Sequence, residues 1–358
     1  MTPAVWIATL LLLSAPGEAP KAEQFPPPGD CRDDDGVDRC SAEQQGRVRE
    51  LFAVAPIETH RDAGDQVRRA FYVDGYGNDI VAIAFIRPKG GDPMLRVHFP
   101  RAPDGTRTEP QQAPVPPDVW EDLIRRSGHF DEPLRRLAEA PSASGEMTLC
   151  IHGWVFTVEA TDPAEGEYRP ATLRRKTEGG CDDGLVEAYA VELQRAAVPL
   201  LPHCARLDRS RHRNEATLLS ACRLLRGDRL AAAEVMNRLD AFRSVEAAED
   251  WPLLRGLFAH DARIDWAGET LAAAGGSAEA WARKMSEGGP TSLYWDHVEG
   301  ESAERVRFVG QLSRSIEGEE RYRLARVEQI WVREGRDFQI ERATVGNFEP
   351  EPPSGAKP

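Results

Sequence analysis

The chain lacks a surplus of basic residues: 45 lysines and arginines stand against 59 aspartates and glutamates, and the formal net charge is -14. Nucleic-acid binding depends on clustered basic side chains that neutralise phosphates, so this balance argues against a nucleic-acid partner. The sequence also has no apolar run near the ~20 residues that a spanning helix needs, which argues against a stable membrane span. C-x-x-C and H-x-x-x-H spacings are absent as well, so we expect no metal site and no cofactor.

The longest apolar run near the start covers residues 4–13 (AVWIATLLLL) and is followed by small residues. This pattern is typical of a secretory signal peptide, and we place its end at Ala22. The even set of cysteines beyond it agrees with a secreted or periplasmic protein. We expect three disulfides among Cys31, Cys40, Cys150, Cys181, Cys204 and Cys222. Pairing neighbours along the chain closes the shortest loops, but the sequence does not choose among the connectivities.

The chain length of 358 residues favours two folded domains over one. We predict a signal peptide over 1–22, an N-terminal α+β domain over 23–228 with three disulfides, a C-terminal domain over 229–349, and a disordered tail over 350–358.

The N-terminal domain shows both strand and helix patterns. Residues 67–73 and 80–86 are rich in β-branched and aromatic side chains and flank a Gly and Asn turn, which predicts a hairpin. Residues 185–200 and 215–225 have helical patterns and would place Cys204 and Cys222 on neighbouring helices. This part of the sequence resembles no family.

The C-terminal domain has a more informative order of elements. A helix is expected from Arg229, strand alternation at 258–266, and a further helix at 277–285 that Ser277 caps. Four alternating segments follow, at 293–299, 305–315, 322–333 and 337–347. Helices followed by a meander predict an α+β domain in which a curved antiparallel sheet wraps onto helices.

Two motifs in this domain carry a resemblance to a known family: FAHDARI at 258–264 and VEQIWVREGRDFQI at 327–340. They resemble the nuclear-transport-factor-2-like (SnoaL-like) superfamily over about a third of the chain. The resemblance implies a cone-shaped domain whose pocket is lined by the concave face of the sheet. Some members of the superfamily are isomerases, dehydratases or hydrolases, and others only bind ligands or form dimers, so the fold does not fix the activity.

In the ketosteroid-isomerase branch a tyrosine and a protonated acid hold an oxyanion, and an aspartate moves the proton. The resemblance puts the tyrosine position at Phe242, which has no hydroxyl, and the base position at Trp266, which has no carboxylate. Only the acid position has a suitable side chain, Glu328. Asp265 lies one residue early and is expected to point away from the pocket. On the strand that carries the acid, alternation places the side chains of Leu324, Arg326, Glu328 and Ile330 on one face. Arg326 and Glu328 could form an ion pair on the pocket wall.

The leading hypothesis is an exported protein that binds a small apolar molecule or a protein partner in the cone pocket without catalysis. Its expected wall consists of Phe242, Trp266, Trp281, Trp295, Leu324 and Ile330. The second hypothesis is an exported isomerase, dehydratase or hydrolase that uses Glu328 with Arg326 or a histidine, His260 or His297. The third is a structural module of the cell envelope that forms a homodimer through its sheet.

Overall fold

The structure is a computed structural model that describes residues 46–74, 76, 78–101, 107–127, 154–166, 168–180, 185–247, 254–271, 276–287, 291–315 and 322–350. The predicted signal peptide, the predicted tail from residue 351 on, and Cys31, Cys40, Cys150 and Cys181 lie outside these residues. The chain divides into two compact units, Met1–Val48 and Arg49–Pro358, and every element described below belongs to the second.

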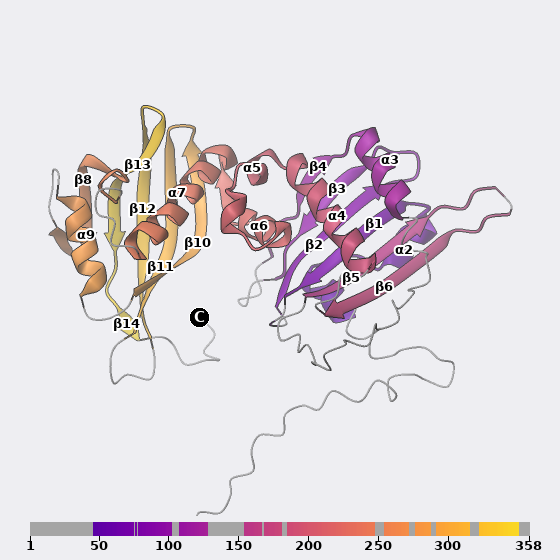
Figure 1. The fold of residues 1–358 in the computed structure, drawn as a ribbon, viewed down its shortest axis with the longest axis horizontal. Helices are drawn as coiled ribbons and strands as arrows, with labels where there is room; N and C mark the ends of the chain where they lie inside the picture. Colours follow the sequence, from indigo (N-terminus) through magenta and orange to yellow (C-terminus); the bar gives the residue numbers. More distant parts are fainter. Residues whose placement is uncertain are drawn as a thin grey trace, which may run out of the picture. The chain divides into compact units, whose positions relative to one another are not determined.

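The first sheet has six strands in the order β4-β3-β2-β1-β5-β6, and all neighbours in it are antiparallel (Figure 1). The predicted hairpin is confirmed. Its two strands are followed by the shorter strands β3 and β4. The strands are β1 (Gln66–Val73), β2 (Asp79–Arg87), β3 (Met94–His98), β4 (Gln111–Pro114), β5 (Trp154–Asp162) and β6 (Thr172–Gly180).

Helices contact both faces of this sheet. On one face α4 (Leu185–Leu200) contacts β1, β2, β5 and β6, and α6 (Glu215–Cys222) contacts β2. On the other, α2 (Ile57–Ala63) contacts β1, β5 and β6. The remaining helices are α3 (Pro117–Arg126), the single turn α5 (Pro202–Ala205) and a 3-10 turn at Arg209–Arg211. Because both faces of β1 are covered, its neighbouring residues Arg68 and Arg69 are both buried although they point to opposite sides.

The second sheet has eight strands in the order β7-β10-β11-β12-β13-β8-β9, with β14 paired to β12. The meander from β10 to β13 is antiparallel, as predicted. Two pairs are parallel, β7 with β10 and β8 with β13. The strands are β7 (Leu225–Gly227), β8 (Phe258–Trp266), β9 (Glu269–Leu271), β10 (Thr291–Ser302), β11 (Arg305–Arg314), β12 (Arg323–Glu334), β13 (Asp337–Val345) and β14 (Glu349–Pro350).

Two helices pack on this sheet, and the fold is the predicted cone-shaped α+β arrangement. Helix α7 (Arg229–Ala247) contacts β10, β11 and β13, and α9 (Ser277–Ser286) contacts β8. The register shifts within the β10–β11 pair, at Trp295/His297 and Gly300/Ser302, and such irregularities bend a strand and increase its twist. None of the helices that the structure describes combines the length and apolar character needed to cross a membrane.

Candidate functional site

Strand β12 separates the predicted catalytic residues from the helix-covered core. Ala325, Val327, Gln329 and Trp331 are buried on one face of the strand. Leu324, Arg326 and Glu328 alternate with them and therefore face the other side of the sheet. The fourth predicted wall residue, Ile330, is also buried, and the register with β13 shifts directly after it.

Glu328 and Arg326 do not form the expected ion pair with each other in the described part of the chain. Arg326 is exposed and Glu328 is half-buried. On the neighbouring strand, Arg307 has its pKa raised by a hydrogen bond to Glu299, with smaller contributions from burial in the opposite direction and from the nearby charge of Glu328. The structure thus places Glu328 in a charged sheet surface and not in an enclosed site.

Two of the three tryptophans predicted to line the pocket pack against each other. Trp266 and Trp281 are buried, with ring centroids 5.5 Å apart in an edge arrangement. Phe258 lies 6.4 Å from Trp281, and Trp295 is partly buried. Phe242 belongs to α7, but its side chain lies outside the described residues. Asp265 points away from the core, as expected, and binds Arg263 on the surface.

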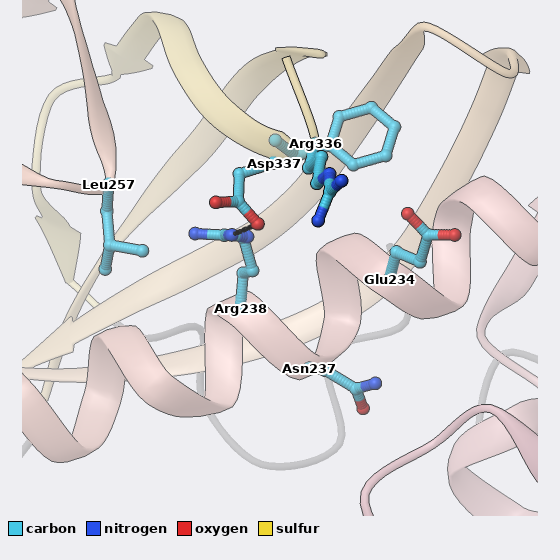
Figure 2. A pocket seen from close by; sticks show the side chains of 7 residues that line it. Glu234, Asn237, Arg238, Leu257, Arg336 and Asp337 are labelled. Atoms are coloured by element: carbon cyan, nitrogen blue, oxygen red, sulfur yellow. Dashed lines mark ion pairs between the residues drawn. The ribbon is translucent and has the colours of Figure 1, made fainter. Parts of the chain in front are cut away.

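A hollow of about 370 Å³ lies between α7 and the turn that joins β12 to β13 (Figure 2). Helix α7 contributes three polar side chains one turn apart, and the turn contributes three residues in succession. The lining consists of Glu234, Asn237, Arg238, Leu257, Arg336, Asp337 and Phe338. Leu257 and Phe338 give the hollow an apolar part, and the other five residues are polar or charged.

Ion pairs neutralise most of the charges around this hollow. Arg238 on α7 pairs with Asp337 on β13. Glu234 pairs with Arg333 at 2.9 Å, and the Arg333 guanidinium lies 4.2 Å from the centre of the Phe338 ring. Arg336 is exposed, and its side chain makes no ion pair within the described residues. The hollow therefore combines an apolar surface with one guanidinium that is free to bind.

His260 lines a different hollow, of about 410 Å³, beside the start of α9. Arg255, which also lines it, is held by an ion pair with Glu279. The Oγ of Ser277 donates a hydrogen bond to the carbonyl of Ala262 at 2.6 Å. None of the predicted partners of His260 lies in this hollow. Its full lining is Arg255, Phe258, Ala259, His260, Ser277, Ala278, Glu334 and Gln339.

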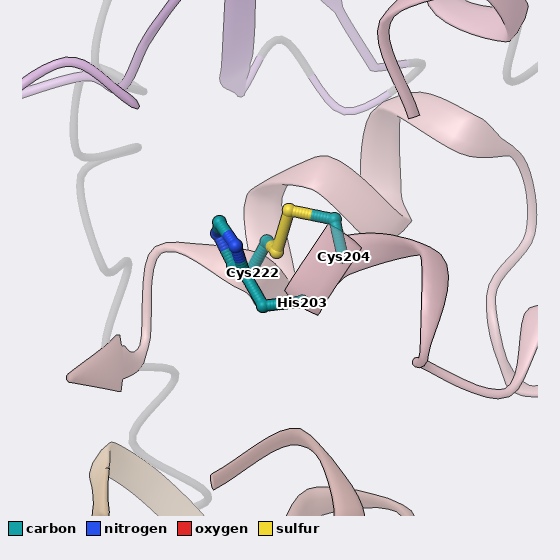
Figure 3. Close-up of side chains that lie close together, drawn as sticks. All are labelled: His203, Cys204 and Cys222. Atoms are coloured by element: carbon teal, nitrogen blue, oxygen red, sulfur yellow. A yellow bond between two sulfur atoms is a disulfide. The ribbon is translucent and has the colours of Figure 1, made fainter. Parts of the chain in front are cut away.

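A disulfide joins Cys204 on α5 to Cys222 on α6, which confirms one of the neighbour pairings and the placement on adjacent helices (Figure 3). His203 lies beside it, and burial, with the nearby charge of Arg229, lowers the pKa of His203 to about 4. Gln111 on β4 connects the two helices: its Oε1 lies 3.1 Å from Nε2 of His203, and its Nε2 donates to the carbonyl of Cys222 at 3.1 Å.

No model of a protein family matches the sequence, and no curated protein matches it either. Solved structures of NTF2-like and cystatin-like fold are similar to about a third of the chain. An NTF-2-like protein of unknown function from Shewanella oneidensis is 8% identical over 32% of this chain and 97% of its own, with a TM-score of 0.28. A cystatin-like fold protein from Burkholderia xenovorans is 19% identical over 34% and 94%, also at 0.28. A DUF3225 family protein of unknown function from Pectobacterium atrosepticum is 21% identical over 33% and 91%, at 0.27.

The residues of the hollow in Figure 2 are not among those that the sequence predicted for a site. Glu234 and Arg238 have the spacing of an ordinary surface ion pair on a helix, and their partners lie about a hundred positions away in the sequence. A local signal was present in Arg336, which follows Gly335 in a tight turn. The residues around that turn do not indicate that it lies next to α7.

Proposed function

We propose that residues 229–349 form a nuclear-transport-factor-2-like domain. The order of its elements supports this proposal: a long helix, the strand β8, the helix α9 and then the meander β10 to β13. The two motifs that carry the resemblance fall on β8 and on the β12–β13 hairpin.

We propose that this domain is a binding module and that the hollow in Figure 2 takes a small organic anion, a carboxylate attached to an apolar group. The observation that carries the proposal is Arg336, whose guanidinium pairs with no carboxylate among the residues that the structure describes and lines the same hollow as Leu257 and Phe338. A guanidinium binds a carboxylate through two parallel hydrogen bonds. The apolar group would lie against the small parts of Leu257 and Phe338 that remain exposed, 4% and 1% of the two residues. The volume of about 370 Å³ fits a small molecule.

The other residues of the hollow support selectivity for an anion over a cation. Glu234 and Asp337 already pair with arginines, so a cationic ligand would have to compete with those guanidinium groups. We assign no catalytic role to Glu328, because it lines neither of the two hollows.

We also propose that the chain acts in the periplasm or outside the cell. The Cys204–Cys222 disulfide supports this location, since disulfides persist in oxidising compartments and are rare in the cytosol.

Calorimetric titration with a panel of aliphatic and aromatic monocarboxylates tests the binding proposal. At least one of them should bind the wild type, and Arg336→Gln should weaken that binding about tenfold to a hundredfold, because a charge-assisted hydrogen bond is lost. Arg326→Gln is the matched control, since Arg326 is an exposed arginine on the other face of the same hairpin, and it should leave the affinity unchanged. The proposal fails if no carboxylate binds or if Arg336→Gln binds as tightly as the wild type.

A further inference from the structure

Four potential metal-ligand atoms meet where β4, α5 and α6 come together. The ligand atoms of His203, Cys204 and Cys222 all lie within 4.8 Å of one another (Figure 3). Gln111 adds a fourth, because its Oε1 lies 3.1 Å from Nε2 of His203 and 3.4 Å from Sγ of Cys204. The set therefore contains one nitrogen, two sulfurs and one amide oxygen.

We propose that this cluster is a redox-controlled zinc site, closed by the Cys204–Cys222 disulfide and opened when that bond is reduced. Zinc prefers four tetrahedral ligands, with thiolate and imidazole among the commonest, at Zn–S distances of about 2.3 Å and Zn–N distances of about 2.0 Å. The amide oxygen of Gln111 would take the place that a carboxylate oxygen holds in other zinc sites. Ligand atoms in such a site are then about 3.3 to 3.8 Å apart. Oε1 of Gln111 already lies close to this range from Nε2 of His203 and from Sγ of Cys204, and the His203 ligand atom lies within 4.8 Å of both sulfurs. Reduction lets the two sulfurs move apart, which the site requires.

The charges agree with zinc in a buried place. Cys204 and Cys222 are fully buried, and Gln111 is nearly so. An isolated dication would be costly there, but Zn²⁺ with two thiolates, a neutral imidazole and a neutral amide has no net charge. Such a complex also avoids repulsion by Arg229, the positive charge that His203 experiences.

The reaction is balanced by a reductant of the dithiol class. A dithiol gives two electrons and two protons to the Cys204–Cys222 bond and becomes a cyclic disulfide itself. The two protein thiols then lose their protons to solvent as they bind Zn²⁺, so one zinc ion replaces two protons. In the reverse direction a cyclic disulfide takes the two electrons and two protons from solvent, becomes the dithiol again, and leaves the Cys204–Cys222 bond and free Zn²⁺.

The test uses Co²⁺ as a spectroscopic probe on the full chain. The protein is reduced with dithiothreitol, freed of it under argon and titrated with Co²⁺, and the oxidised protein is treated in parallel. The reduced wild type should show thiolate-to-cobalt charge transfer and the strong visible bands of tetrahedral Co²⁺. The oxidised protein and a reduced Cys204→Ser/Cys222→Ser variant should both lack the part of the charge-transfer and visible absorption that comes from cobalt bound to these two thiolates. This double variant corrects for the four other cysteines, which it retains.

Two single variants identify the remaining ligands. His203→Ala and Gln111→Leu should each weaken Co²⁺ binding at least about tenfold and shift the visible bands. Gln112→Leu is the matched control, because Gln112 is the exposed neighbour of Gln111 on β4, and it should bind like the wild type. The proposal is overturned if the reduced wild type and the double variant give the same spectrum, or if the oxidised protein binds equally well.

A second measurement covers the case in which reduction unfolds the chain. Zn²⁺ should then restore the near-ultraviolet circular dichroism of the reduced wild type, because metal binding stabilises the folded state. His203→Ala should recover much less at the same zinc concentration. Equal recovery in the two proteins, or none in either, overturns the proposal.

Discussion

Arg69 donates a hydrogen bond to Glu159 directly across the paired strands β1 and β5, and both side chains are buried. Arg175 donates to the same carboxylate at 2.7 Å, and Arg49 lies 3.7 Å from it. A single buried carboxylate thus compensates three guanidinium groups on the face of the sheet that α2 covers.

Glu159→Gln is therefore expected to destabilise the protein by about 3 to 5 kcal/mol, since it leaves the buried guanidinium of Arg69 without its compensating charge. Urea unfolding followed by circular dichroism measures the loss. The control Glu165→Gln changes an exposed pair with Arg169 and should cost less than about 1 kcal/mol.

A double variant distinguishes charge compensation from packing. Replacing Arg69 by Met and Glu159 by Leu removes both charges, and Arg175 keeps Glu58 as a partner at 3.1 Å. The double variant should be more stable than Glu159→Gln alone, because the fully buried guanidinium of Arg69 is then absent, and Arg49, which also loses its partner, is partly exposed to solvent. A double variant at least as unstable as Glu159→Gln contradicts this explanation.

The longer strands of the C-terminal sheet and the first hairpin of the other sheet follow from local patterns in the sequence. Alternation and β-branched residues predict β1, β2 and the meander β10 to β13, because burial of one or both strand faces determines these patterns. Neither the strand β7 nor its position in the sheet is indicated by such a local pattern. β7 is only three residues long, and its parallel pairing with β10 depends on residues more than 70 positions apart.

The candidate sites show the same limit. Alternation correctly groups Glu328 with Arg326, but it does not decide which face meets the helices. The apolar set Val327 and Trp331 was the better signal for the core face. The proposed zinc ligands come from segments that are far apart in the sequence: Gln111 belongs to one, and His203, Cys204 and Cys222 belong to the other. Spacing rules cannot detect such a set, because only the fold brings it together.

The stability should decrease as the pH falls from about 6.5 toward 4. Burial, followed by the charge of Arg96, lowers the pKa of His98 to about 4, while an unfolded histidine has a pKa near 6.5. In this window the unfolded chain binds a proton that the folded chain does not. His98 therefore contributes a loss of up to about 1.4 kcal/mol per pH unit, complete below pH 4.

Urea unfolding at several pH values checks this dependence, and His98→Gln should have a shallower slope than the wild type. A slope remains in the variant, because the pKa of His203 is also near 4. An NMR titration of His98 gives an independent answer: a midpoint near 6.5 in the folded protein would be incompatible with the expected burial effect.

The Cys204–Cys222 disulfide should contribute about 3 kcal/mol to stability, because its sequence separation of 18 closes a loop of moderate length. Cys204→Ala/Cys222→Ala tests this in metal-free buffer. The loss should be equal with and without Zn²⁺ for this variant, whereas the reduced wild type should gain stability with Zn²⁺.

Gly227 and Gly300 hold β7 against β10 at a distance that no side chain permits. A Cβ on Gly227 would lie 2.2 Å from the carbonyl oxygen of Gly300, and the backbone of Gly227 has a φ of +61°. Gly227→Ala should therefore cost at least about 2 kcal/mol, from left-handed strain and from the forced separation of the two strands. Gly335→Ala separates these causes, because Gly335 has a φ of +65° but no atom within 4 Å of the added carbon. It should cost only about 1 kcal/mol, and equal losses in the two variants would show that strand contact adds nothing to the strain.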